Sequence, residues 1–339
     1  RVPGYLVSSG TGAGMGDDVP FVLGKSQFEL TTWLGRCQHF FAITNPVYLL
    51  ATQDQLAVAK QKILGCQTGS SLPEGTTNRE LWQAQTLCDA VLHPDTKEPV
   101  PVMFRVCAFA PANIPICLGM LMAPPTLFNV VFWQWVNQSY NAGFNYCNRN
   151  ATSSLDNKSL AQMYLGATTL SVTTAVGLGQ ALKAAPLSAA TAAFLGRIVP
   201  FVAVAGSNAF NVSVMRSGEL STGIPVKDED GNVRGISKAA AKSAVTQAAI
   251  TRMVMPAPVL LLPPVFMQVF DKVVKLPPRM RAGVEFTVII ACVAGALPAA
   301  IALFPQEASI SVDKLEPEFH NLTSKDHTPI RTLTFNKGV

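Results

Sequence analysis

Charged side chains are scarce in this sequence. Of its 339 residues only 14% are charged, against about a quarter in a typical soluble domain. Hydrophobic residues make up 49%, and the mean hydropathy is +0.28. Scarce charge combined with long apolar runs indicates a protein that lies in a lipid bilayer. The net charge of +5 is spread along the chain without a basic cluster, which argues against a nucleic-acid partner.

Clustered metal ligands and catalytic motifs are also missing. The seven cysteines form no C-x-x-C pair and are odd in number, which argues against a disulfide framework or a structural zinc site. The four histidines are scattered outside the apolar runs, so no metal path is predicted. We find no nucleophile–base pair and no phosphate-binding glycine loop. We therefore expect no cofactor and no enzymatic activity.

Composition divides the chain into four regions. The start is rich in glycine and serine and has neither the apolar core of a signal peptide nor the arginine-rich character of a transit peptide. Two capping-box sequences, at 52–55 and 77–80, predict helices in the water-facing part that follows. The predicted regions are a disordered tail at 1–27, a helical extramembrane region at 28–103, a transmembrane domain at 104–305 and a C-terminal tail at 306–339.

Five apolar segments predict an all-α membrane protein with about five transmembrane helices. Their lengths suit a hydrocarbon core about 30 Å thick. Several contain proline, which frees backbone carbonyls. Two interpretations stay open: kinks used for packing, or broken helices around a binding site. The predicted spans are 106–123, 161–182, 196–215, 253–270 and 283–304.

The stretch FWQWVNQSYNAGFNYCNRN at 132–150 combines aromatic residues with an amide every few positions. At 100° per residue its amides fall within an arc of about 100°, which predicts an amphipathic helix with a neutral polar stripe. Amides cost less than charges in hydrocarbon and still bind polar ligands. The stripe consists of Gln134, Asn137, Gln138, Asn141, Asn145 and Asn148.

Three roles for this stripe are possible. Amides can join membrane helices through hydrogen bonds worth about 0.6 kcal/mol each, but six on one face exceed what joining requires. A helix lying flat in the interface usually has a Lys/Arg-rich polar face, which this one lacks. We therefore favour a polar cavity wall, and the sequence leaves open whether 132–148 spans the membrane.

A second polar wall is predicted on the third span, where Asn208 and Asn211 lie three residues apart. Arg197 and Arg252 stand at the starts of the third and fourth spans. Each can extend to the headgroups, as long cationic side chains do. Alternatively, each can hold a carboxylate with two hydrogen bonds. We count both as candidate substrate-binding residues beside the amides.

Several stretches resemble the sideroflexins, a family of mitochondrial inner-membrane carriers. They are LHPDT at 92–96, the amide-rich stretch, GRIVPFVAVAGSNAFNVSVMRSGEL at 196–220 and FNKGV at the C-terminal end. The resemblance runs from about Phe28 to Val339. It implies a five-span protein of the mitochondrial inner membrane that is imported without a cleavable presequence. It also implies transport of serine, with alanine and cysteine as related substrates, to supply one-carbon metabolism in the matrix.

Citrate is an alternative substrate, since an older label of the family is tricarboxylate carrier. NRNAT at 148–152, MYLGA at 163–167 and LEPE at 315–318 are similar to a branch for which citrate transport has been proposed. A trivalent anion should need several buried cations, and only Arg197, Arg216 and Arg252 lie near spans. The residues thus favour a small neutral amino acid. A non-transporting membrane scaffold is the third hypothesis.

The HPDT motif, with His93, Asp95 and Thr96, predicts a structural turn, because proline ends the preceding helix and the next side chains can cap the turn. A gate at the membrane surface is the functional alternative. In the family this motif is usually followed by Gly and Glu, whereas Lys97 and Glu98 follow here.

The loop at 271–282 suggests an orientation. It holds four basic residues, Lys272, Lys275, Arg279 and Arg281, so the positive-inside rule places it on the side of insertion. With five spans the N-terminus shares that side, which in this compartment is the matrix. Glu285, at the start of the last span, is expected to pair with Arg279 or Arg281. The sequence leaves the oligomeric state open.

Overall fold

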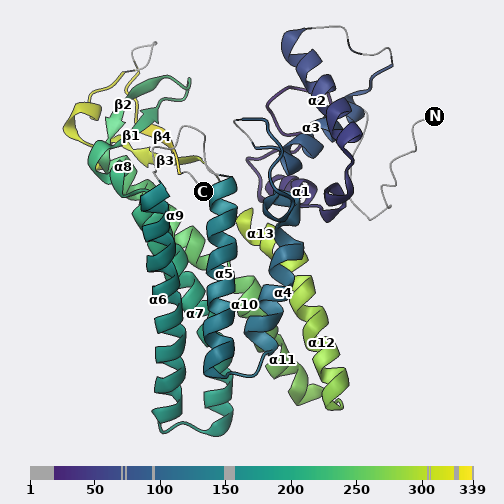
Figure 1. Ribbon diagram of the computed structural model, residues 1–339. Helices are drawn as coiled ribbons and strands as arrows, with labels where there is room; N and C mark the ends of the chain where they lie inside the picture. Colours follow the sequence, from purple (N-terminus) through teal and green to yellow (C-terminus); the bar gives the residue numbers. More distant parts are fainter. Residues whose placement is uncertain are drawn as a thin grey trace.

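The structure is a computed structural model that describes residues 19–337 except 70–71, 73–74, 94–95, 149–156, 304, 306 and 324–327. It combines a long helical bundle with two smaller parts at one end of the bundle, a group of helices and a β-sheet (Figure 1). The helices are α1 Trp33–Ile43, α2 Gln53–Thr68, α3 Asn78–Val91, α4 Phe109–Met122, α5 Leu127–Cys147, α6 Asn157–Ala184, α7 Ala189–Met215, α8 Ser217–Thr222, α9 Lys238–Val254, α10 Ala257–Leu260, α11 Leu262–Val273, α12 Pro278–Ala291 and α13 Leu297–Ile301. The strands are β1 Ile224–Lys227, β2 Val233–Ser237, β3 Glu307–Ser311 and β4 Thr332–Asn336.

The N-terminal helices confirm the two predicted starts. α2 has a complete capping box between Thr52 and Gln55. At α3 the Thr77 hydroxyl accepts a hydrogen bond from the backbone N–H of Glu80, and the helix ends at Val91, ahead of the proline. The two helices share one apolar core, which stabilises them against each other. Its buried members are Leu56, Ala59, Ala84, Leu87, Ala90, Val91, Leu92 and Cys107.

The bundle helices α4 to α7 run up and down side by side, and α6 packs on both α5 and α7 (Figure 1). Short connections at 123–126 and 185–188 join them at the end far from the sheet. The α11–α12 connection, 274–277, lies at that same far end, opposite α1–α3 (Figure 1). The N-terminal region and the basic loop therefore lie at opposite ends of the bundle, because the chain runs along it an odd number of times between them: as α4, α5, α6, α7 and the α9–α11 segment. The side of the membrane that each end faces stays a prediction.

Three helices of the described residues are long and apolar enough to cross a membrane: Ala189–Met215, Lys238–Val273 and Pro278–Ile301. They contain the predicted spans 196–215 and 253–270 and most of 283–304. The predicted span 106–123 is a shorter apolar helix, Val106–Met122, and 161–182 lies in α6, which is long enough but less apolar. The count of five predicted spans thus reduces to three on these criteria.

A four-stranded antiparallel sheet with the order β2-β1-β4-β3 covers one end of the bundle. β1 pairs with β2 as a hairpin, while β4 pairs with β3 and meets β1 where Lys227 faces Thr334. This corrects the all-α prediction and the prediction of a C-terminal tail at 306–339. Strands of four or five residues carry too little alternation to be recognised in sequence, and the contact that joins the two halves of the sheet, between Lys227 and Thr334, links residues about a hundred positions apart.

The sheet closes over a compact apolar core with the start of α9. Phe335 and Phe319 are each 2% exposed, and Leu333 and Val226 are fully buried. Three alanines of α9 complete this core, and their small size lets the helix approach the sheet closely. The core consists of Ile224, Val226, Ala240, Ala241, Ala244, Val312, Leu315, Phe319, Leu333 and Phe335.

Glu316 ties the C-terminal segment to the first turn of α9. Its carboxylate accepts hydrogen bonds from the Ser237 hydroxyl (2.6 Å) and from the backbone N–H groups of Lys238 (2.8 Å) and Ala239 (2.9 Å). Negative charge at a helix N-terminus is stabilised by the helix dipole and the free N–H groups. Burial alone would raise the pKa of Glu316, but these hydrogen bonds outweigh burial and hold it below its usual value.

Stability of this end of the molecule should therefore depend on Glu316 and on pH. A carboxyl group has an unperturbed pKa of about 4.3; because the folded value is lower, its contribution is complete above that pH and is lost as pH falls through the folded value. We expect Glu316→Gln to destabilise the sheet by about 1–2 kcal/mol at pH 7, with a smaller difference from the wild type at pH 3.5. Thermal unfolding at both pH values measures this. The exposed Glu318→Gln is the matched control, and equal melting of both variants at pH 7 would refute the role.

Candidate functional site

A cavity of about 180 Å³ lies between α4, α5, α7 and the α9–α11 segment, in the half of the bundle nearer the sheet. Its apolar lining includes Phe109, Cys117, Met120 and Val204. Its polar lining is made of amides and two arginines, and no described carboxylate contributes to it. The polar lining residues are Asn113, Asn137, Asn141, Asn145, Asn208, Asn211, Arg216 and Arg252.

α5 brings three of the predicted amides to this cavity. The Thr126 hydroxyl caps the helix by accepting from the backbone N–H of Asn129 at 3.2 Å, and the helix then runs unbroken for 21 residues. Asn137, Asn141 and Asn145 recur every four residues, so they share one face, and all three line the cavity. Three of the six residues of the predicted polar stripe thus lie along one wall of this cavity.

The two glutamines of the stripe act between helices. The Ser171 hydroxyl of α6 donates to Gln134 Oε1 at 2.6 Å. Gln138 Nε2 donates to the Ser207 hydroxyl of α7 at 2.7 Å and to Ser171 at 3.4 Å. Both serines are fully buried. Gln138 does not line this cavity. It joins α5 to α6 and α7, as the helix-joining interpretation expects.

Asn137 has an unused donor at the small cavity. The residue is 4% exposed, and within the described part of the chain its Nδ2 has no hydrogen-bond partner. A buried donor left unpaired costs about 1–3 kcal/mol. A polar solute in the cavity would remove this cost. On the facing wall, Asn208 Nδ2 donates to the carbonyl of Arg252 at 3.3 Å, which fixes α7 against α9.

The two arginines of this cavity differ in their pairing. Arg216 is neutralised by Glu219, with Nε–Oε1 at 2.9 Å and Nη2–Oε2 at 2.5 Å, and it also donates to the carbonyl of Lys337. Arg252, half-buried on α9, forms no ion pair within the described residues. The guanidinium of Arg252 therefore gives the cavity one unbalanced positive charge, which favours the binding of a carboxylate.

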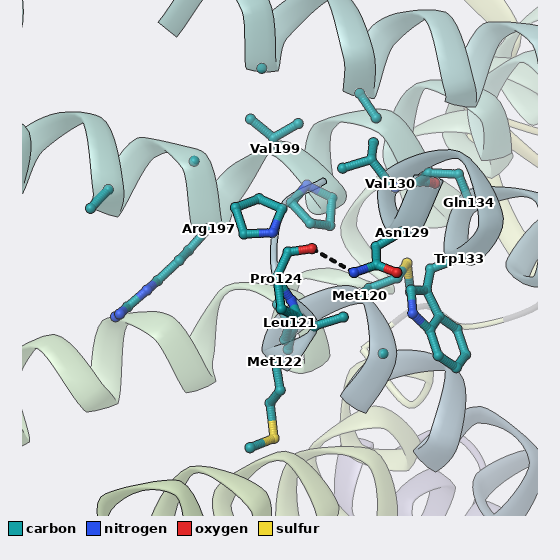
Figure 2. A pocket seen from close by; sticks show the side chains of 18 of the residues that line it. Met120, Leu121, Met122, Pro124, Asn129, Val130, Trp133, Gln134, Arg197 and Val199 are labelled. Atoms are coloured by element: carbon teal, nitrogen blue, oxygen red, sulfur yellow. Dashed lines mark hydrogen bonds between the residues drawn. The ribbon is translucent and has the colours of Figure 1, made fainter. Parts of the chain in front are cut away.

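Arg197 and Gln134 lie elsewhere, in a larger cavity of about 660 Å³ between α4, α5, α6, α7 and α12. Figure 2 shows them on opposite sides of this cavity, with Pro124 and Asn129 between them. The sequence analysis grouped Arg197 with Arg252, but the structure separates them. The predicted pairing of Glu285 is confirmed, since its Oε2 accepts from Arg281 Nη1 at 2.9 Å.

The described residues of the HPDT motif, His93 and Thr96, line neither cavity. The backbone N–H of His93 donates to the carbonyl of Glu98 at 2.9 Å, and that of Lys97 donates to the carbonyl of His93 at 3.0 Å. Thr96 is exposed, and Asp95 lies outside the described residues. Lys97 has φ of 57°, a left-handed conformation that favours glycine, which is what the family motif has there. The turn interpretation accounts for these bonds, and the gate stays a prediction.

Sequence reasoning missed two cavity residues on α4. Asn113, 8% exposed, lines the small cavity while its Nδ2 donates to the carbonyl of Phe109 at 2.8 Å. Met120 lines both cavities. An asparagine inside the apolar 106–123 segment was a usable signal for the first. A methionine in an apolar segment gives no signal for the second.

The fold and the cavities define a helical membrane protein with a polar site enclosed between its helices. The chain belongs to the sideroflexin family: a sequence model described as "Sideroflexins" matches residues 22–339. Similar proteins include human Sideroflexin-5, 44% identical over 95% of this chain and 94% of its own length. A sideroflexin of Dictyostelium discoideum is 40% identical, and human Sideroflexin-1 is 39% identical, each over 93% of this chain and 96% of the relative. No solved structure matches the chain.

Proposed function

We propose that this sideroflexin carries a small neutral amino acid, serine foremost, across the mitochondrial inner membrane to supply one-carbon metabolism in the matrix. One observation carries the proposal: asparagines line the small cavity together with the guanidinium of Arg252, which forms no ion pair within the described residues. Such a site suits a zwitterion, because the carboxylate needs a fixed cation and the ammonium can be held by neutral hydrogen-bond acceptors. Alanine and cysteine are the related substrates.

Each polar group of serine has a counterpart in the cavity. The carboxylate takes the Arg252 guanidinium, which offers two parallel donors. The ammonium donates to amide oxygens of Asn141, Asn208 or Asn211, and the unpaired Nδ2 of Asn137 donates to the hydroxyl or the carboxylate. A volume of about 180 Å³ is well above the roughly 10–15 Å³ that one water molecule needs, so the cavity has room for a small solute.

The proposal includes a membrane arrangement in which α5 and α6 cross beside the three apolar helices. Their positions alongside α7 support it (Figure 1), as does the burial of their amide and hydroxyl groups against one another. In hydrocarbon such groups must be paired within the protein or face a water-lined cavity. α4 completes the arrangement, and α1–α3 and the sheet then lie on the same side of the membrane.

Citrate fits the site less well. A trivalent anion needs several cations, yet Arg216 is already paired with Glu219 and Arg197 lies in the other cavity. Among the described arginines of the two cavities, Arg252 is the one that lines the small cavity without an ion pair. The charge of the small cavity therefore favours serine over citrate.

The test is uptake by the purified protein in liposomes, with labelled serine and labelled citrate measured in parallel. We expect serine uptake that unlabelled alanine inhibits and citrate does not. Asn141→Ala should lower serine uptake at least fivefold, whereas Asn321→Ala, an exposed asparagine in the C-terminal region, should leave it unchanged. Uptake of citrate alone would overturn the substrate. No uptake of either by folded protein would favour the non-transporting scaffold.

A further inference from the structure

The larger cavity has no role in the proposed binding site, yet it lies on the same axis of the bundle. The α5 residues that line the small cavity begin at Asn137 and continue towards the sheet. The α5 residues that line the larger cavity run from the 123–126 connection up to Gln134. These two residues are three positions apart, about 4.5 Å along a helix. The same division occurs on α7, between Pro200 and Val204. The two cavities therefore face opposite ends of one bundle.

Met120 lies where the two cavities adjoin. Within the described part of the chain it is the one residue that lines both of them. Gly119, the residue before Met120, fixes the position of this part of α4 against α5, because a Cβ at Gly119 would lie 2.0 Å from the Trp133 indole. α4 can lie this close to α5 only with glycine at that position. Methionine is unbranched and flexible, so its side chain can leave the space between the cavities without moving the backbone.

The larger cavity carries charged and polar groups within a mostly apolar lining. Arg197, Arg281 and Glu285 line it together with Gln134. Glu285 is 9% exposed and is held by Arg281, which also holds Asp271 at 2.9 Å. Charged groups at bundle depth face water-filled cavities or one another. A polar solute could therefore enter from the end formed by the 123–126, 185–188 and 274–277 connections.

We infer that the larger cavity is the second vestibule of the transport path, and that Met120 is the partition between it and the binding cavity. This inference rests on the proposed function, since a path needs an opening to each side. It assigns Gln134 and Arg197 to the second vestibule and Asn137 and Arg252 to the binding cavity. Carriers of this kind hold a fixed site between two alternating openings.

Accessibility to a charged, membrane-impermeant thiol reagent tests the two openings without reference to transport. Val130→Cys places a thiol in the larger cavity and Asn141→Cys places one in the small cavity. The full-length protein is reconstituted in one orientation, and labelling at each introduced residue is read by peptide mass spectrometry, so native thiols such as Cys117 do not interfere. We expect the two positions to react from opposite sides, each at least tenfold faster from its own side. Reaction from the same side, or no reaction at Val130→Cys, would overturn the inference.

The partition is tested by a matched pair of variants. Met120→Ala should join the cavities and increase passive efflux of preloaded serine at least fivefold, while the volume-conserving Met120→Leu should stay within twofold of the wild type. Equal serine efflux from both variants would show that Met120 does not separate the two cavities. If the wild type showed no serine uptake but the two cysteines still reacted from opposite sides, the proposed substrate would fail and the two vestibules would stand.

Discussion

Replacing Arg252 with methionine should weaken serine binding about 10- to 100-fold. Hydrogen bonds to a charged group contribute about 1.5–3 kcal/mol, and each 1.4 kcal/mol is a factor of ten. Methionine keeps the length of the side chain and removes the cation, so the loss reports the carboxylate contact. Because Arg252 forms no ion pair within the described residues, its removal leaves no buried carboxylate unpaired. Equilibrium binding of labelled serine to the purified protein measures the effect.

Two further variants isolate the cause. Arg252→Lys keeps the charge but loses the two-donor geometry, so it should recover part of the affinity. Arg279→Met removes an exposed arginine at the far end of the bundle and should not change binding. Serine affinity within twofold of the wild type for Arg252→Met would show that the guanidinium extends to the headgroups instead, as the simpler interpretation of such arginines holds.

Replacing Phe335 with alanine should destabilise the sheet by about 3–5 kcal/mol, the usual cost of truncating a fully buried phenylalanine. Phe335 is 2% exposed and lies on β4, the strand that joins the β1–β2 hairpin to β3. Its loss leaves a void between the sheet and the alanines of α9. Hydrogen–deuterium exchange of residues 224–237 and 307–336 measures the change, since exchange of protected amides tracks the free energy of local unfolding.

Val233→Ala is the matched control for this prediction. Val233 lies on β2 of the same sheet but is 59% exposed, so truncation should change stability by less than about 0.5 kcal/mol. Faster exchange confined to the sheet is the expected result for Phe335→Ala. Exchange that stays at the wild-type rate in 307–336 would show that the sheet core contributes little to this end of the molecule.

The sequence predicted best those features that depend on local pattern. The capping boxes at 52–55 and 77–80 set the starts of α2 and α3, because side-chain caps act within four residues. The amide spacing on α5 placed Asn137, Asn141 and Asn145 on one wall, because helical periodicity is fixed. The pair between Glu285 and Arg281 also follows from neighbours in the chain.

Features that depend on distant partners were not predictable in this way. Whether Gln138 binds a ligand or another helix is decided by Ser171 and Ser207, which lie 33 and 69 residues away. Whether Arg197 joins Arg252 is decided by how the bundle divides its interior into two cavities. The sheet escaped prediction for the same reason, since β1 meets β4 across more than a hundred residues.

The strand order has a consequence for how the protein is made. β4 lies inside the sheet, between β1 and β3. Glu316, from beyond the last helix of the bundle, accepts from two backbone N–H groups of α9 beside the Ser237 cap. During synthesis, or during passage through a membrane translocase, the β1–β2 hairpin lacks its neighbour β4, and the N–H groups of Lys238 and Ala239 lack this acceptor, until residues 316–336 arrive. Completion of this end is therefore a late event, and interrupted or C-terminally shortened chains would display an open strand edge that quality-control proteases and chaperones can recognise.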